Sequence, residues 1–174
     1  VTIDGHAPGP ETKELVSYLP ERTYLSGWMN VVQLLDFFCD FYPDFDRDAA
    51  EHMLTALEIS PKLRIRQMSK GTREKVQLIL VMSRRARLYL LDEPENSLSP
   101  TRQMELTEYI ENAARFFHCQ FVISTHSPFL LSLRGAKIYD LDSDPVDVRR
   151  WTELENVRTY YDFFKKHERE FSDE

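Results

Sequence analysis

The sequence is poor in cysteine, and its cysteines have no partner at a metal-ligand spacing. Cys39 and Cys119 are the only two in a chain of 174 residues. A disulfide framework and a zinc site built on cysteine pairs are therefore excluded. Two free thiols are typical of a reducing compartment, so we expect a cytoplasmic protein.

Long apolar runs and an excess of basic charge are also missing. No stretch of about 18 apolar residues occurs, and the first residues have no signal-peptide pattern, so we expect no direct insertion into a membrane. The chain has 22 Lys and Arg against 29 Asp and Glu, a net charge of −7. This balance argues against a generally basic surface that coats nucleic acid, although it leaves local basic patches open.

What is present is typical of one soluble domain with a sizeable core, because 42% of the residues are hydrophobic and 29% charged. Apolar patterns and breakers predict strands at 1–4, 15–19, 88–91, 121–124 and 137–141. Helices are predicted at 31–42, 46–59, 71–84, about 100–116 and about 154–170. Strands that alternate with helices predict an α/β fold with a parallel, doubly wound sheet.

Two adjacent carboxylates follow one of these strands. The apolar run at 88–91 predicts a strand buried on both faces, with Asp92 and Glu93 at its carboxyl end, where ligands bind in open α/β sheets. Two carboxylates there are costly unless they meet a cation, a proton or a water to activate. For the pair alone, a strand that runs into solvated charge is the more common explanation.

Two other motifs stand at predicted element ends. Ser69 is a natural N-cap for the 71–84 helix, and Gly71 leaves backbone N–H groups unobstructed, which makes an anion site. The segment FVISTH delivers His126 at the carboxyl end of the 121–124 strand, which we expect to be buried. Taken singly, an ordinary capped helix and a structural histidine are the commoner explanations.

In this order and spacing the motifs resemble those of the ATP-binding-cassette (ABC) ATPases. MSKGT at 68–72 matches the family's signature loop, LYLLDE at 88–93 its Walker B strand, and SLS at 97–99 its D-loop. His126 matches the switch histidine, and YLPE at 18–21 falls where the family has its Q-loop, with Glu21 at the usual glutamine. The resemblance covers nearly the whole chain.

The resemblance implies a P-loop NTPase-like, mainly parallel sheet flanked by helices, with a helical insertion. It implies ATP and Mg²⁺ as cofactors, with Asp92 on the metal, Glu93 on the attacking water and His126 on the γ-phosphate. It also assigns nucleotide contacts to Glu21, Ser69, Lys70, Gly71 and Ser99. Of these, Ser69 and Gly71 would face the nucleotide of a second subunit, across a head-to-tail dimer.

These assignments predict one partial ABC-type ATPase domain over residues 1–174. Within it, about 25–85 would be the helical, signature-containing region, and 86–174 would run from Walker B to the C-terminal helix. The implied function is ATP binding and hydrolysis as the nucleotide-binding subunit of a transporter. A membrane subunit would then dock near 21–45 and hold the protein peripherally at the inner membrane face.

A phosphate-cradling P-loop is absent. The pattern needs Gly-Lys followed by Ser or Thr, whereas the five glycines are followed by His, Pro, Trp, Thr and Ala. VTIDG resembles the family strand that follows the P-loop helix, so we expect a domain that is incomplete at its N-terminus and inactive alone. The alternative is a degenerate remnant kept as an interaction module.

The two halves resemble different branches of the superfamily. Residues 1 to about 94 resemble bacterial transporter subunits, whereas the chain from about 93 onward resembles soluble, transporter-free AAA-type ATPases. Glu21, Lys70 and Ser99 depart from the transporter pattern. A soluble ATPase in defence, repair or another pathway is therefore the second hypothesis for an active protein, and a recombined or fused sequence is a further explanation of the two halves.

Overall fold

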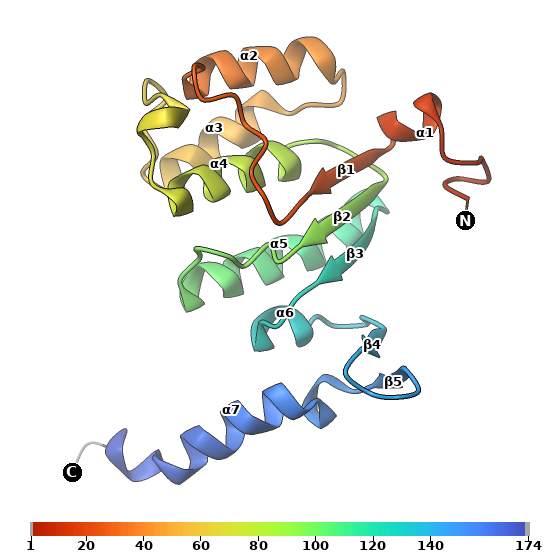
Figure 1. Cartoon of the computed structure of the whole chain (residues 1–174), viewed down its shortest axis with the longest axis vertical. Coiled ribbons are helices and arrows are strands. Elements are labelled where there is room, and N and C mark those ends of the chain that lie inside the picture. The colour runs from red at the N-terminus through yellow and green to blue at the C-terminus, as the bar shows by residue number, and fades with distance from the viewer. Residues whose placement is uncertain (1, 173–174) are drawn as a thin grey trace.

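The computed structural model describes residues 2–172, in which a parallel sheet carries helices on one face and a hairpin lies toward the C-terminal end (Figure 1). The strands are β1 (Val16–Leu19), β2 (Leu88–Asp92), β3 (Gln120–Ser124), β4 (Ile138–Asp140) and β5 (Asp147–Arg149). The longer helices are α2 (Val31–Phe41), α3 (Arg47–Ala56), α4 (Lys70–Met82), α5 (Pro100–Phe117) and α7 (Glu155–Lys166). Short helical elements are α1 (Pro10–Glu14), η1 (Ile65–Gln67), α6 (Pro128–Leu131), η2 (Trp151–Glu153) and η3 (Glu168–Glu170).

The main sheet has the order β1-β2-β3, and both pairs of strands are parallel. Leu19 stands opposite Leu91, and Asp92 stands opposite Ser124. The three strands predicted at 15–19, 88–91 and 121–124 are therefore confirmed. Because they run in the same direction, their carboxyl ends meet at one edge of the sheet.

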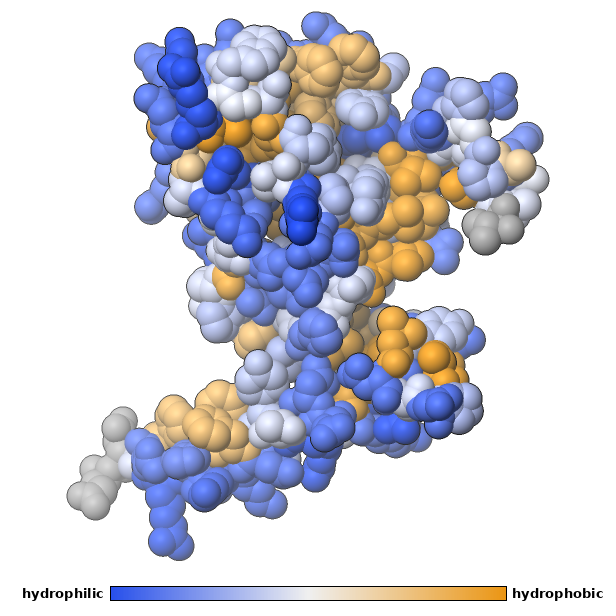
Figure 2. All heavy atoms as spheres, in the orientation of Figure 1, coloured by the Kyte–Doolittle hydropathy of each residue, from blue (hydrophilic) through white to orange (hydrophobic). Residues whose placement is uncertain are grey.

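Within residues 2–172, helices cover one face of this sheet and leave the other uncovered. Leu19, Tyr89 and Leu91 are buried in a hydrophobic cluster with side chains of α4, α5 and α6. On the opposite face Tyr18 and Val122 are each 53% exposed, and Figure 2 shows apolar side chains gathered over β1 and β2. The predictions of a doubly wound sheet, a 88–91 strand buried on both faces and a buried 121–124 strand are thus wrong for residues 2–172. Short apolar runs do not reveal whether a second layer covers them.

Two other strand predictions need correction. The segment 137–141 does form β4, but β4 pairs antiparallel with β5 in a separate two-stranded sheet. The segment predicted at 1–4 is no strand over its described part, because Ile3 and His6 form an isolated bridge around Asp4 and Gly5. Asp4 and Gly5 both have positive φ, which closes a tight turn where an extended strand was expected.

Helices α2, α3 and α4 enclose a second hydrophobic cluster, to which Leu35, Phe38 and Leu54 belong. Asn30 caps α2 by accepting from the Gln33 backbone N–H. The later turns of α4 belong to both clusters, because Val76, Ile79 and Leu80 face the helices while Leu78, Val81 and Met82 face the sheet. Helix α4 is therefore a rigid connection between the helical region and the sheet.

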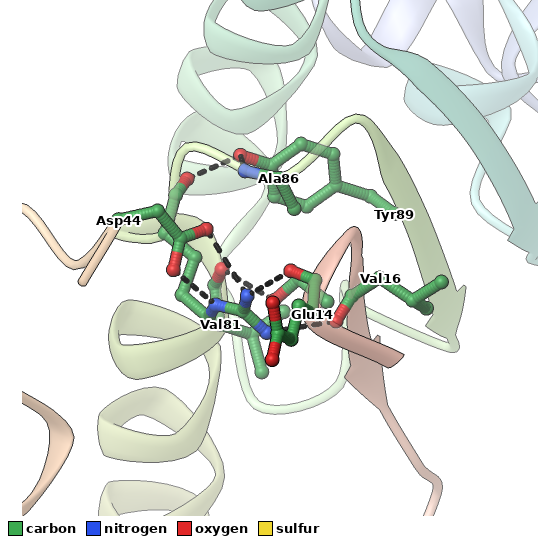
Figure 3. A network of polar contacts seen from close by, with 8 residues as sticks. Glu14, Val16, Asp44, Val81, Ala86 and Tyr89 are labelled. Atoms are coloured by element: carbon green, nitrogen blue, oxygen red, sulfur yellow. Dashed lines mark hydrogen bonds and ion pairs between the residues drawn. The ribbon is translucent and has the colours of Figure 1, made fainter. Parts of the chain in front are cut away.

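The buried Arg84 joins the same two parts through polar contacts (Figure 3). Its guanidinium donates to the carbonyls of Glu14 and Val16, at 2.6 and 2.8 Å, and to both carboxylate oxygens of Asp44, at 3.1 Å each. It also lies 4.0 Å from the ring centre of Tyr42. The planar arginine guanidinium has five N–H donors and suits this site, because the two carbonyls and the carboxylate need donors in several directions.

Among residues 2–172, no helix has the length and apolar character needed to cross a bilayer.

Candidate active site at the carboxyl edge of the sheet

Three of the predicted site positions follow the carboxyl ends of neighbouring strands. Glu21 lies two residues beyond β1, Glu93 directly follows β2, and His126 lies two residues beyond β3. Asp92 is the last residue of β2 itself. The expected parallel arrangement of the strands that deliver Asp92, Glu93 and His126 is confirmed. Their chemical roles stay predictions.

Glu93 is held in an unusual backbone conformation. Its φ is 46°, in the left-handed region that non-glycine residues seldom adopt. The Glu93 N–H donates to the Ser124 carbonyl at 2.9 Å, and the Asn96 side-chain amide donates to the Glu93 carboxylate at 2.8 Å. Backbone strain of this kind, about 1–3 kcal/mol, is concentrated at functional sites. The turn therefore fixes the Glu93 carboxylate beyond the edge of the sheet.

The part of the chain that the structure describes contains no cluster of three or more His, Cys, Asp or Glu side chains able to enclose a metal ion. This is compatible with Mg²⁺ at Asp92, because Mg²⁺ commonly uses one or two carboxylates together with waters and substrate phosphates. Asp92 would supply one hard oxygen ligand at the strand end. A bound Mg²⁺ would neutralise charge on the phosphates.

Glu95 is a residue of the site that the sequence interpretation missed. Its Oε1 accepts from the backbone N–H groups of His126 and Ser127, each at 3.1 Å, and from the Thr125 hydroxyl at 2.5 Å. A single carboxylate oxygen of Glu95, in the turn after β2, thus holds the loop after β3 by hydrogen bonds. No local pattern marks Glu95, because its role arises only when the turn after β2 lies beside the loop after β3.

The His126 loop has a second support. The side-chain amide of Asn156, at the start of α7, donates to the His126 carbonyl at 3.3 Å. The His126 side chain itself is exposed. Its backbone is therefore fixed from both sides, by Glu95 and by Asn156, while the imidazole is accessible to a ligand.

The start of α4 behaves in part as predicted. Ser69 is its N-cap, and its hydroxyl accepts from the Thr72 N–H at 3.1 Å. Gly71 lies against Ser97, in the loop that begins at Glu93. The Ser97 hydroxyl also donates to Glu74, one turn along α4, so the signature-like helix and the loop after β2 contact each other within one chain.

The other assigned positions have local roles of their own. Lys70 is highly exposed and forms a 3.6 Å ion pair with Glu74. Ser99 caps α5 by accepting from the Arg102 N–H at 3.5 Å. Gln77 was missed: it is 1% exposed, accepts from the Tyr24 N–H at 3.1 Å and donates to the Pro20 carbonyl at 3.4 Å. Gln77 thereby ties α4 to the loop that carries Glu21. A glutamine inside the apolar run of that helix was its signal.

Residues 55–132, which contain most of these motifs, match the family model described as "AAA domain, putative AbiEii toxin, Type IV TA system". Named relatives come from the ABC transporters. The chain is 24% identical over 117 residues to the ABC transporter ATP-binding protein YtrB of Bacillus subtilis, covering 67% of this chain and 40% of that protein. It is 30% identical over 118 residues to the phosphonates import ATP-binding protein PhnC 2 of Albidiferax ferrireducens, covering 61% and 42%. The chain thus spans less than half the length of these two relatives.

A solved structure with the same arrangement is an ATP-binding subunit of an ABC transporter. It superposes with a TM-score of 0.59 at 26% identity and covers 71% of this chain and 55% of that one. The parallel sheet, the ordered motifs at its carboxyl edge and these similarities support an ABC-type ATPase domain, matched over part of its length, with a P-loop NTPase fold.

Proposed function

We propose that the chain is the part of an ATP-hydrolysing module that supplies the Walker B carboxylates, the switch histidine and the signature loop. The observation that carries this proposal is the convergence of Asp92, Glu93 and the His126 loop on adjacent parallel strands. In this scheme Glu93 orients or deprotonates the attacking water. His126 would contact the γ-phosphate, and Asp92 would hold Mg²⁺, which neutralises charge on the phosphates.

A phosphate loop is needed to complete the site, because its backbone N–H groups and lysine hold the β- and γ-phosphates. None of the five glycines here is followed by Lys and then Ser or Thr. We infer that residues outside this sequence supply the loop. A strand that carries it has a place on the outer edge of β3, which is the last strand of the described sheet and leads to His126.

The first test is calorimetric titration of this chain with MgATP. We expect no binding of micromolar affinity, because the chain lacks the phosphate loop. Tight, magnesium-dependent binding would contradict the need for a loop from elsewhere.

The second test uses a protein in which a P-loop segment is joined to this chain. Glu93→Gln should reduce ATP hydrolysis by about 10²-fold or more while ATP binding is kept, because the amide cannot accept a proton from water. Glu105→Gln, on the exposed side of α5, is the matched control and should hydrolyse normally. Unchanged hydrolysis in Glu93→Gln would remove Glu93 from the catalytic role.

The proposed mechanism also includes a head-to-tail dimer, in which Ser69 and Gly71 of one subunit meet the nucleotide of the other. Helix N-termini favour anions, which supports this role for the start of α4. Glu93→Gln should then accumulate an ATP-bound dimer, measurable by light scattering with and without ATP. A variant that binds ATP and stays monomeric would argue against the shared site.

For the biological setting, we propose the nucleotide-binding subunit of a transporter, held by a membrane partner on the cytoplasmic side. Its support is the naming of the relatives as transporter ATP-binding proteins. The AAA-type family model over residues 55–132 favours the second hypothesis, a soluble ATPase that works without a membrane partner. Co-purification of the intact protein with a membrane-spanning subunit would distinguish them.

A further inference from the structure

A cleft lies beside the β4-β5 hairpin, which Figure 1 shows beyond α6. One wall is the segment 131–138, which leads from the end of α6 into β4, and the other is 148–153, which leads from β5 through η2. The cleft encloses about 660 Å³, and most of its lining, at 134–137 and 148–153, is exposed. It is therefore an open trough, in which a polymer can make several contacts while a small ligand would stay largely in water.

The charge of this cleft is opposite to that of the whole sequence. Its lining contains four basic residues, Arg134, Lys137, Arg149 and Arg150, and one acidic residue, Glu153. The sequence as a whole has a net charge of −7. The Glu153 carboxylate already accepts from the Arg150 backbone N–H at 3.1 Å. A local concentration of positive charge on an acidic protein attracts a polyanion to this one place.

Two of the four cations are available to a ligand. Arg134 and Arg149 each have a carboxylate partner, at 3.4 and 3.3 Å. Lys137 and Arg150 form no ion pair within the described residues 2–172, and the Lys137 Nζ lies 5.0 Å from the ring centre of the exposed Tyr139. Both can therefore meet a phosphate without the loss of an existing ion pair.

Trp151 adds a flat apolar surface to the same cleft. It begins η2 directly after Arg150 and is 39% exposed, whereas Leu154, at the end of η2, is buried. Exposed aromatic rings beside basic side chains bind single-stranded nucleic acid, because unpaired bases stack on the rings while the cations hold the phosphates. We propose that this cleft binds single-stranded nucleic acid, with a base on Trp151 and phosphates on Lys137 and Arg150.

Two other polyanions fit the cleft less well. The exposed turn between β4 and β5 contains Asp142 and Asp144, so a flat anionic membrane that approaches the hairpin would meet like charge. An acidic peptide would satisfy the cations but brings no planar base for Trp151. A single strand can follow the trough and use both kinds of side chain.

The test is fluorescence anisotropy of a labelled oligothymidylate of about 15 nucleotides, titrated with this chain at low salt and without ATP. We expect a dissociation constant on the order of 10 micromolar that rises with salt, because few phosphates are contacted. Lys137→Glu and Arg150→Glu should each weaken binding roughly fivefold or more. Lys62→Glu, an equal change in charge in the exposed loop before η1, is the control and should have little effect. No binding at low salt, or equal weakening in all three variants, would overturn the proposal.

Tryptophan fluorescence tests the stacking. The sequence has two tryptophans, and Trp28 is 63% exposed, so a Trp28→Phe variant reports on Trp151 alone. The oligonucleotide should quench its fluorescence. Trp151→Ala should weaken binding roughly fivefold or more, whereas Trp151→Phe should keep most of it. Both variants should keep the circular dichroism spectrum of the original chain, because Trp151 is outside the two core clusters. An unquenched Trp151 would overturn the stacking and with it the assigned ligand.

A duplex of the same length distinguishes single strands from any phosphate chain. It should bind more weakly although it carries twice the charge, because its base faces are covered. Equal or tighter binding of the duplex would overturn the assignment to a single strand. Tighter binding of phosphatidylserine vesicles or of polyglutamate, lost in Lys137→Glu and Arg150→Glu, would overturn the choice of ligand.

This binding site is separate from the proposed ATPase function. None of the variants changes a residue assigned to the carboxyl edge or to the start of α4, and every measurement omits ATP. Failure here would therefore leave the ATPase proposal intact, and failure of that proposal would leave the cleft to be judged by its own test.

Discussion

A Cβ atom on Gly71 would lie 3.0 Å from Oγ and 3.1 Å from Cβ of Ser97. The start of α4 and the loop after β2 therefore approach so closely that a side chain at position 71 requires Ser97 to move. The contact lies within one chain. It gives Gly71 a structural reason to be glycine, in addition to the proposed approach of its backbone to a phosphate.

We predict that Gly71→Ala costs less free energy of unfolding when residue 97 is glycine than when it is serine. The Ser97→Gly change removes the crowded atoms and suits the φ of 63° at that position. A double-mutant cycle by urea unfolding should give a coupling of about 0.5 kcal/mol or more. If the effects of the two substitutions on the free energy of unfolding simply add, the loop moves without an energetic cost and the predicted crowding is refuted. This cycle measures the structural cost of a side chain at position 71. A Gly71 variant that loses ATP-driven dimerisation should therefore be corrected for that cost before the loss is attributed to nucleotide contact.

Removal of the Arg84 guanidinium should strongly destabilise the fold. Arg84→Met should lower the free energy of unfolding by about 3–5 kcal/mol, because Asp44 and two carbonyls lose a buried partner. Arg84→Lys should recover only part of the loss, since an ammonium cannot reach all of these acceptors. Arg85→Met is the matched control. Arg85 is exposed and its guanidinium pairs with Asp46 at the surface, so the change in the urea midpoint should be far smaller.

Glu95 should control the order of the His126 loop. In Glu95→Ala, the His126 backbone amide loses its acceptor and should exchange hydrogen about tenfold faster or more, whereas the Ser127 amide keeps the Thr125 hydroxyl as an acceptor and should change less. Glu95→Gln keeps a carbonyl oxygen and should behave nearly as the original. Asn96→Ala changes the same turn but contacts Glu93, so exchange at 126–127 should be unaffected. Equal exchange in Glu95→Ala and the original chain would refute the support we assign to Glu95.

Asp46 is the N-cap of α3, and its carboxylate should make the stability of the fold depend on pH. The Ala49 N–H, and then the Arg85 guanidinium, hold the pKa of Asp46 below its ordinary value of 3.8. Since the folded state has the lower pKa, this stabilisation is complete above the unfolded pKa and is lost as the pH falls through the folded one. Asp46→Ala should cost about 1 kcal/mol at neutral pH. Thermal unfolding from pH 7 to pH 2 should show that difference shrinking in acid, whereas a constant difference would contradict the ionised cap.

Several features of the protein were determined by local sequence. The apolar run at 88–91 and the periodic helices set β2, α2 and α4, because strand and helix periods depend on neighbouring residues. Ser69 is the N-cap it was predicted to be, since capping needs only the next few N–H groups. The alternation of strands and helices predicted the parallel strands that deliver Asp92, Glu93 and the loop with His126.

Only the tertiary structure decided the rest, because those features join residues far apart in the chain. Nothing in the alternation of short strands shows that one face of the main sheet lacks a covering layer in the described part of the chain, or that β4 pairs with β5 in a separate sheet. The support of His126 by Glu95, 31 residues earlier, requires β2 and β3 to be neighbours before the carboxylate can reach the amide. The Arg84 contacts span 70 residues to Glu14. Side chains acquire such roles from packing, which no local pattern encodes.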